Sequence, residues 1–303
     1  MKKILLYSIS LTLIVLFAGC ENETSPMDTD LFPSKVYIVG ARDQIVEREI
    51  ELGNMIDTIA VSVAVSGSRP LNKDVTVTIK ENIDEIDLYN QRNVSGEDVQ
   101  YQKPDDSIYS YPLQQLTIKA GEVYNTFPIH IKPESLQCDS LYMIPIRLNT
   151  ISDYELSDND TTVLVRLHLV NKYSGLYYVE GILKNTTNVT DSVMYKMTRN
   201  LVATDNGSTV RMYHYNNETK DYRSTHTFKI TINSDNTLSY STWDKFEIFD
   251  GGGVYYPDVE VYDFWYEYNN NGTRWRAEGL LYKERKTSAE QEELDDWLDE
   301  HKQ

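Results

Sequence analysis

Apolar and polar residues alternate along most of the chain, and this alternation constrains the fold more than any other feature. Val75, Val77 and Ile79, for example, alternate with Thr76 and Thr78. Successive side chains of a β-strand point to opposite faces, so a period of two indicates strands with one buried and one exposed face. The sequence therefore predicts an all-β protein, with helix confined to short stretches.

Between residues 35 and 170 the pattern predicts about eight strands separated by polar turns. The expected strands are Lys35–Gly40, Gln44–Leu52, Ile59–Ser66, Val75–Ile79, Gln115–Lys119, Val123–Lys132, Leu141–Asn149 and Val163–Val170. Their spacing is typical of an antiparallel sandwich of immunoglobulin type, and Asp84–Arg92 is predicted as a short helix between strands. Beyond Cys20 only Cys138 remains, so no cysteine pair can brace this part.

A second set of strands follows the polar stretch Asn171–Gly175, where we place a domain boundary. The expected strands are Gly175–Lys184, Ser192–Ala203, Ser208–Tyr215, Ser224–Asn233, Thr237–Phe249, Val254–Val261, Tyr262–Tyr268 and Thr273–Tyr282. Turn-forming residues link them, at Asn206-Gly207, Asn216-Asn217, Ser234–Asn236, Gly251–Gly253 and Asn270–Gly272. Short links predict an antiparallel meander, which either closes into a lipocalin-like barrel or stays an open curved sheet.

The last segment has a helical pattern. Thr287 and Glu290 have the spacing of a capping box, and Leu294, Trp297 and Leu298 fall on one stripe of a helix. The sequence thus predicts a sandwich over 34–171, a meander or barrel over 172–285, and an amphipathic C-terminal helix over 286–303. We expect the helix to dock on the barrel, with partner binding as the alternative.

The first twenty residues have the pattern of a secretory signal. A basic start, Met1–Lys3, precedes the apolar run Ile4–Phe17, which is too short to span a bilayer. The tetrapeptide Phe17-Ala18-Gly19-Cys20 resembles a bacterial lipobox. The resemblance implies that residues 1–19 are removed and that Cys20 becomes a lipidated N-terminus. The alternative is a plain signal peptide with an incidental cysteine.

Residues 20–33 are polar and acidic, and we expect them to form a flexible tether. Acidic residues after the lipidated cysteine resemble a Bacteroidetes signal for export to the outer face of the outer membrane; retention in the periplasm is the alternative. The net charge of the chain is −18, and loss of Lys2 and Lys3 makes it −20. Such a charge repels nucleic acid and anionic lipid headgroups, so we expect the lipid alone to hold the protein at the membrane.

Two motifs in the first half resemble a known family. Ala120-Gly121-Glu122 forms a small-Gly-Glu turn after a strand, and Tyr142-Met143-Ile144-Pro145 matches a later Tyr-x-x-Pro. Residues 35–170 are thus similar to the N-terminal domain of many Bacteroidetes surface lipoproteins, known as domain of unknown function 1735. The second half resembles the C-terminal domains that accompany it. Because members are often encoded beside glycan-import machinery, the resemblance implies polysaccharide handling.

Aromatic residues of the second half supply a candidate glycan site. On the predicted strand Tyr262–Tyr268, the side chains of Asp263, Trp265 and Glu267 share one face, and those of Tyr262, Phe264, Tyr266 and Tyr268 share the other. An indole between two carboxylates can hold a sugar, because its ring stacks on the C–H face while the carboxylates accept hydroxyl hydrogens. The alternative is that Trp265 packs under a loop or the C-terminal helix.

Four further residues belong to this candidate site. Tyr255 and Tyr256 lie next to the glycine triplet and are second stacking candidates, with core or loop packing as the alternative. Arg274 and Arg276 share one face of the last strand; cross-strand ion pairs with Asp263 or Glu267 are the simpler account of them. Since the whole chain is strongly acidic, we expect a neutral ligand.

The sequence contains no recognisable catalytic or metal-binding motif. The five histidines lack zinc-ligand spacing, and we expect neither a metal nor a cofactor. Asp258 and Glu260, two apart on a predicted strand, would lie roughly 7 Å apart, within the range of about 6.5–9.5 Å for an inverting glycosidase. Because the chain has 47 acidic residues, such pairs are common.

These observations favour a lipid-anchored outer-membrane protein, facing the cell exterior, that is not an enzyme. We expect it to bind an oligo- or polysaccharide for a glycan importer complex. Two alternatives remain: a fimbria-like adhesin or structural lipoprotein, which would use strand edges, and a glycoside hydrolase, which needs a cleft with facing carboxylates.

Overall fold

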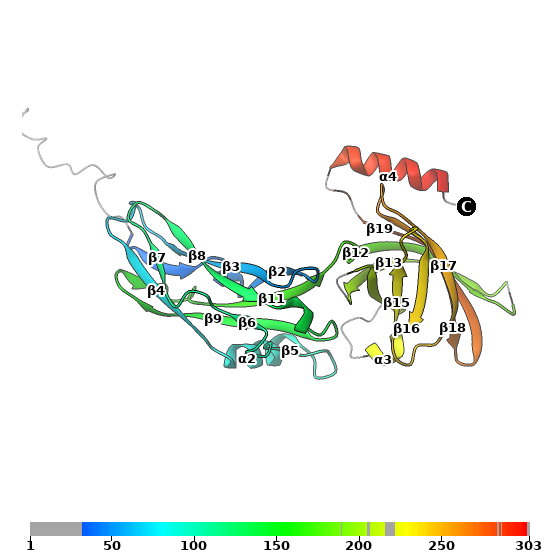
Figure 1. Ribbon diagram of the computed structural model, residues 1–303, viewed down its shortest axis with the longest axis horizontal. Coiled ribbons are helices and arrows are strands. Elements are labelled where there is room, and N and C mark those ends of the chain that lie inside the picture. Colours follow the sequence, from blue (N-terminus) through cyan, green and yellow to red (C-terminus); the bar gives the residue numbers. More distant parts are fainter. Residues whose placement is uncertain are drawn as a thin grey trace, which may run out of the picture.

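The computed structural model describes residues 32–188, 190–204, 207–215, 222–283, 285 and 287–301. Within them the protein is almost entirely β, with a short C-terminal helix, as the alternation predicts. Figure 1 shows two β parts arranged end to end. The predicted signal segment, Cys20 and almost all of the tether lie outside the described residues.

The first part consists of two sheets packed face to face. One has the order β10-β1-β3-β8-β6 and the other the order β2-β11-β9-β4-β7, with β5 paired to β9. The strands are β1 (Lys35–Ile38), β2 (Ile45–Glu51), β3 (Asp57–Val65), β4 (Val75–Glu81), β5 (Tyr101–Gln102), β6 (Tyr109–Ser110), β7 (Leu116–Ile118), β8 (Tyr124–Ile131), β9 (Leu141–Ile151), β10 (Glu155–Leu156) and β11 (Thr162–Val170).

The pairing of these strands differs in part from the antiparallel prediction. β1 pairs with β10, β2 with β11 and β5 with β9 in parallel, while the other pairs are antiparallel. Parallel strands need a crossover connection, and β2 and β11 are separated along the chain by all the strands from β3 to β10. The prediction of a sandwich is confirmed.

The core of the sandwich is filled by alternate residues of both sheets. Val63 of β3, Phe127 of β8, Ile144 of β9 and Val165 of β11 are fully buried in one cluster. Burial of one such side chain contributes roughly 1.5–3 kcal/mol, so packing can hold this part together without a disulfide.

Three short helices lie between the strands of the sandwich. The predicted helix forms as α2 (Asp84–Asn93), and its Ile86 packs on Met143 and Leu164. The 3₁₀ helix η2 (Ala41–Asp43) turns the chain from β1 into β2. A second 3₁₀ helix, η3 (Pro133–Ser135), follows β8.

The second part is a nearly closed barrel of one eight-stranded sheet, in the order β16-β15-β14-β13-β12-β19-β18-β17. Its strands are β12 (Gly175–Asn185), β13 (Ser192–Ala203), β14 (Thr209–Tyr213), β15 (Thr227–Ile232), β16 (Leu238–Thr242), β17 (Ile248–Tyr256), β18 (Val261–Asn270) and β19 (Thr273–Tyr282), and α3 (Arg223–His226) precedes β15. At the seam between β16 and β17, an isolated bridge pairs Thr237, just before β16, with Val254. Tyr255 N also donates to the carbonyl of Asn236 at 2.8 Å. The lipocalin-like meander of the prediction is therefore confirmed as an almost complete barrel.

The predicted strands between residues 237 and 261 are partly wrong: Thr237–Phe249 is divided between β16 and β17, and Val254–Val261 is interrupted by a turn. The glycine triplet was expected to link two strands, but Gly251–Gly253 lies inside β17. The glycines fit there because rings lie against them: a Cβ on Gly252 would come within 3.0 Å of Trp265 Nε1, and a Cβ on Gly251 would overlap the ring of Tyr240. The turn falls instead at residues 257–260, where Pro257 lacks the N–H that a strand needs.

The C-terminal helix α4 (Ser288–His301) lies against the outside of the barrel (Figure 1). Its predicted capping box is present: Glu290 N donates to Thr287 Oγ1 at 3.3 Å, and Thr287 N donates to Glu290 Oε2 at 3.2 Å. Leu294 and Leu298 are buried against Val261. None of the helices in the described ranges has the length and apolarity that a membrane crossing requires.

Polar contacts join the two parts where β11 leads into β12. Asn171 Nδ2 donates to the carbonyl of Thr209 at 3.1 Å, and Arg211 Nε lies 3.5 Å from Asp139 Oδ1. The last sandwich strand, β11, ends at Val170, and the first barrel strand, β12, begins at Gly175. Independent folding of the two parts stays a prediction.

Candidate functional site

The predicted glycan face lies on the outside of the barrel. Tyr262, Phe264, Tyr266 and Tyr268 of β18 are at most 1% exposed in the barrel core, as the alternation requires. Asp263, Trp265 and Glu267 point outward, with Asp263 exposed and the other two half-buried.

Both faces of the Trp265 indole are in contact with the protein. Beneath it lies Gly252 of the neighbouring strand, whose missing side chain leaves room for the ring. Above it lies the guanidinium of Arg276, with its carbon 4.1 Å from the ring centroid. A sugar could therefore stack on this indole only after the Arg276 side chain had moved.

Arg276 itself is held by two carboxylates. Its Nε donates to Glu278 Oε2 at 2.8 Å, and its Nη1 lies 3.9 Å from Glu267 Oε1. Arg274 also pairs with Glu267, and Lys184 pairs with Glu278. The expected cross-strand ion pairs thus form with Glu267; within the described residues none forms with Asp263. The outer face of β18 and β19 is a ladder of alternating charges.

The two tyrosines beside the glycine triplet do not join this face. Tyr255 is 1% exposed and packs in the barrel core, with its ring centroid 4.7 Å from that of Tyr262. It therefore cannot serve as an exposed stacking surface. Tyr256 is half-buried under α4, where its ring centroid lies 4.9 Å from that of Trp297. Strand parity explains the difference, because adjacent residues point to opposite faces.

Asp258 and Glu260 also differ from the prediction. They lie in the turn between β17 and β18 and not on a strand, so the argument from strand spacing does not apply to them. Arg285 Nη1 donates to Glu260 Oε2 at 3.2 Å. Among the described residues, no group of three or more His, Cys, Asp and Glu side chains is arranged to hold a metal ion.

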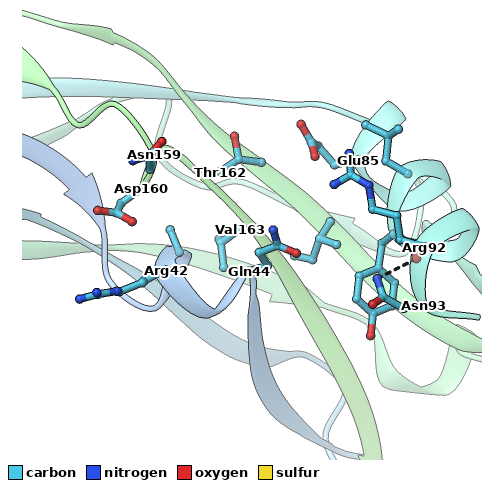
Figure 2. A pocket seen from close by; sticks show the side chains of 13 residues that line it. Arg42, Gln44, Glu85, Arg92, Asn93, Asn159, Asp160, Thr162 and Val163 are labelled. Atoms are coloured by element: carbon cyan, nitrogen blue, oxygen red, sulfur yellow. Dashed lines mark hydrogen bonds between the residues drawn. The ribbon is translucent and has the colours of Figure 1, made fainter.

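A polar pocket that the sequence did not indicate lies at the edge of the sandwich. It has a volume of about 570 Å³ and is bounded by η2, by α2 and by the start of β11. Figure 2 shows Arg42, Asn159 and Asp160 on one side, Glu85, Arg92 and Asn93 on the helix at the other, and Gln44 with Val163 between them. The volume is within the range of about 300–1,000 Å³ that is usual for ligand pockets.

Local backbone geometry places the residues at one wall of the pocket. Gly40 and Gln44 flank η2, and both adopt left-handed conformations, with φ of 87° and 64°. Gln44 is held there by two backbone bonds: its N–H donates to Ala41 O at 3.0 Å, and its carbonyl accepts from Leu164 N at 2.8 Å. A left-handed residue other than glycine is uncommon, and such strain often occurs at binding sites.

Four polar side chains of the pocket are available to a ligand. Within the described residues, no hydrogen bond or ion pair is found for the side chains of Arg42, Gln44, Arg92 and Asn159. The carboxylates of the pocket are partly engaged: Glu85 accepts from Asn82 at 3.0 Å, and Asp160 accepts from Ser157 at 3.1 Å.

The charge of the pocket differs from that of the whole chain. Its lining has two arginines, Arg42 and Arg92, and two carboxylates, Glu85 and Asp160, so it is formally neutral although the chain carries −18. The amide side chains and arginines of the pocket can donate hydrogen bonds, and its amide oxygens and carboxylates can accept them. The hydroxyl groups of a sugar both donate and accept, so they need both kinds of partner. Tyr89 contributes an aromatic ring, fixed by a bond from Arg166 Nη2 to its hydroxyl at 3.1 Å.

Sequence reasoning missed this pocket because its residues come from three distant segments. None of them belongs to a motif, and each is an ordinary loop or helix-surface residue by itself. The one local signal is the tight turn between Gly40 and Gln44. This turn indicates a pocket wall only when it is known that β2, which follows it, lies beside β11.

Comparison with known proteins identifies the architecture. A family model described as an N-terminal domain matches residues 32–155, and one described as a C-terminal domain matches residues 161–282. The chain belongs to the family of proteins that pair these two domains. In this chain the N-terminal match covers most of the sandwich, including the motifs around Gly121 and Pro145, and the C-terminal match covers the barrel. The two matches agree with the resemblance inferred from those motifs. Among curated proteins, none matches the sequence.

Solved structures with the same fold come from Bacteroides. A Bacteroides ovatus protein of unknown function is 18% identical, with a TM-score of 0.65 over 82% of this chain and 93% of that chain. A B. ovatus multidomain protein that includes domain of unknown function 1735 is 19% identical, with a TM-score of 0.61 over 79% and 89%. An auxiliary nutrient binding protein of Bacteroides thetaiotaomicron is 15% identical, with a TM-score of 0.59 over 86% and 94%. At these identities the likeness establishes the fold.

Proposed function

We propose that the protein is a lipid-anchored surface protein that captures a neutral glycan, and that the polar pocket between η2, α2 and β11 is the binding site. The observation that carries the proposal is the pocket itself, with four uncommitted polar side chains and no net charge. A binding role also fits a fold shared with a nutrient binding protein of Bacteroides.

The outer face around Trp265 is the weaker candidate for the same function. Its indole is covered by Arg276, and its carboxylate Glu267 is already paired with two arginines. Ligand binding there would first have to break these contacts, whereas binding in the pocket would not. The proposal is for binding without hydrolysis, with delivery of the glycan to an importer complex at the outer membrane.

The proposal is tested with the chain from Glu21 onward on a glycan array, followed by calorimetry with the glycan that binds. Asn159→Ala and Gln44→Ala should each weaken binding roughly 2- to 10-fold, since each removes one hydrogen-bonding group worth about 0.5–1.5 kcal/mol. Asn54→Ala is the matched control, because this exposed asparagine lies in the turn after β2 and outside the pocket.

Three outcomes separate the candidates. Weaker binding by the two pocket variants, with unchanged binding by the control, supports the proposal. Loss of binding in Trp265→Ala alone would move the site to the outer face of the barrel. If no glycan binds at millimolar concentration, glycan capture is wrong and the adhesin alternative is favoured.

A further inference from the structure

The interior of the barrel is filled on one side and hollow on the other. On the filled side, Phe228, Phe246 and Tyr268 pack around Tyr266, whose ring centroid lies 4.5 Å from that of Phe228. On the other side a cavity of about 180 Å³ lies against β12, β13 and β14. Tyr266 belongs both to the packed cluster and to the cavity wall, as do Val179 and Met212.

The wall of this cavity is mostly apolar. Leu183 of β12, Met197 of β13 and Met212 of β14 face it, together with the ring of Tyr195. Apolar cavities of about 150 Å³ stay dry in water and take up a molecule as small as benzene. Thioether sulfurs also make favourable contacts with aromatic rings, worth roughly 0.3–1.5 kcal/mol. Size and lining therefore fit one aromatic ring.

One part of the wall is polar and firmly held. Arg199 is only 3% exposed, and its guanidinium donates to the carbonyls of Thr198 and His214, both at 2.9 Å. These bonds fix the position of a polar group in a wall that is otherwise mostly apolar. Beside it, His214 Nδ1 lies 2.8 Å from the Tyr266 hydroxyl, and burial lowers the pKa of His214 to about 3, so its ring is neutral near pH 7.

We propose that this cavity is a second ligand site, which takes a small molecule with one aromatic ring and one hydrogen-bond acceptor. The ring lies between Met197 and Met212, and the acceptor faces the wall that contains Arg199 and His214. Among the described residues that line the cavity, Arg199 and His214 form its polar part, so a polar group of the ligand is least costly to bury at that edge. The site is separate from the polar pocket of the sandwich and does not depend on glycan binding.

The test measures thermal unfolding of the chain from Glu21 onward with benzoate, benzyl alcohol or toluene. A ligand that binds the folded state alone raises the melting temperature in proportion to its concentration above Kd. We expect benzoate and benzyl alcohol to raise it more than toluene. Methyl resonances of Met197 and Met212 should shift with the same ligands.

Two methionines of β13 provide a matched pair of variants. Met197→Trp fills the cavity and should remove the ligand-induced rise. Met194→Trp is the control, because Met194 is 80% exposed on the opposite face of the same strand, and it should keep the rise. Leu183→Phe fills the cavity from β12 and replaces Met197→Trp if that variant does not fold.

Either of two results would overturn the inference: none of the three compounds raises the melting temperature, or the cavity-filling variants respond as strongly as the wild type. If toluene raises the melting temperature and neither benzoate nor benzyl alcohol does, the site does not favour a ligand with a hydrogen-bond acceptor, and that part of the inference is wrong. Glycan binding is measured on the same variants, and it should be unchanged in Met197→Trp. The failure of one proposal is therefore distinguishable from the failure of the other.

Discussion

The guanidinium of Arg276 covers the indole of Trp265, with 4.1 Å between the guanidinium carbon and the ring centroid. Arg276 is anchored to Glu278 on its own strand and pairs with Glu267 on β18. Trp265, which the sequence predicts as the sugar-stacking ring, is thus covered by one of the charged side chains on the outer face of β18 and β19. This contact decides how the variants of Trp265 and Arg276 should behave.

Replacing Trp265 by alanine should lower stability and leave glycan binding unchanged. The ring loses its contacts with Gly252 and Arg276, and for a half-buried side chain we expect about 1–2 kcal/mol, below the 3–5 kcal/mol of a core tryptophan. Urea unfolding and calorimetry on the same sample measure both quantities. Binding that falls about 5- to 150-fold, corresponding to about 1–3 kcal/mol, with unchanged stability would instead mean that Trp265 stacks on the sugar.

Arg276→Ala tests from the other side of the contact whether Trp265 binds the sugar. If Trp265 is the platform, Arg276→Ala uncovers it and strengthens binding roughly 2- to 5-fold, because displacement of the guanidinium no longer costs about 0.5–1 kcal/mol. If the polar pocket is the site, as we expect, the affinity stays the same. Calorimetry with the glycan found on the array distinguishes the two.

His214 should make the barrel acid-sensitive. Burial is the main cause that lowers its pKa from 6.5 to about 3, so between these values the unfolded chain binds a proton that the folded chain does not. Stability above pH 6.5 is therefore unaffected by this group and decreases as the pH falls below 6.5, by roughly 2 kcal/mol at pH 5. His214→Gln should remove this contribution in urea unfolding between pH 7 and pH 5. An identical pH slope in wild type and variant would contradict the assignment.

Lipid anchoring is tested at Cys20. Cys20→Ser should release the protein from the membrane fraction or mislocalise it, and globomycin should leave the wild-type precursor uncut. Fractionation and mass of the mature protein are the measurements. Normal membrane retention of Cys20→Ser would rule out the lipid anchor, and protease accessibility of intact cells then tests exposure on the outer face.

The two parts should fold separately. Residues 33–171 and 172–303, expressed individually, should each show β-type circular dichroism and a cooperative melt. The second piece loses the bond from Asn171 to Thr209, which should cost it roughly 1 kcal/mol. Failure of both pieces to fold would mean that the contacts across the junction, including Arg211 with Asp139, are essential.

Strand alternation predicted the architecture well, because burial of one face sets the period of each strand. It placed Tyr262, Phe264, Tyr266 and Tyr268 in the core. Separate helical signals predicted α2 and the capping box of α4 correctly. It failed at Gly251–Gly253, since glycine is typical of turns but also fits a strand on which rings from neighbouring strands lie. Local sequence does not show those rings.

The candidate site was predicted less well than the fold. The face of Trp265 followed from parity, but its cover by Arg276 depends on the register between β18 and β19, which pairs Glu267 with Arg276. The polar pocket depends on η2, α2 and the segment before β11 meeting at one edge. Such long-range placement is decided by sheet order, and no single segment encodes it.

The strand order of the barrel determines where its neighbours attach. β12, where the chain enters the barrel, pairs with β19, where it leaves, from Tyr178 with Tyr282 to Asn185 with Trp275. The first and last strands of the barrel are thus hydrogen-bonded to each other in the middle of the sheet. The seam of the barrel lies between β16 and β17, which are neighbours in sequence. Because the two strands are antiparallel, the residue that follows the sandwich junction and the residue that precedes the C-terminal helix lie side by side, as Tyr178 and Tyr282 show. The attachments of the sandwich and of α4 therefore share one end of the same ladder, away from the seam.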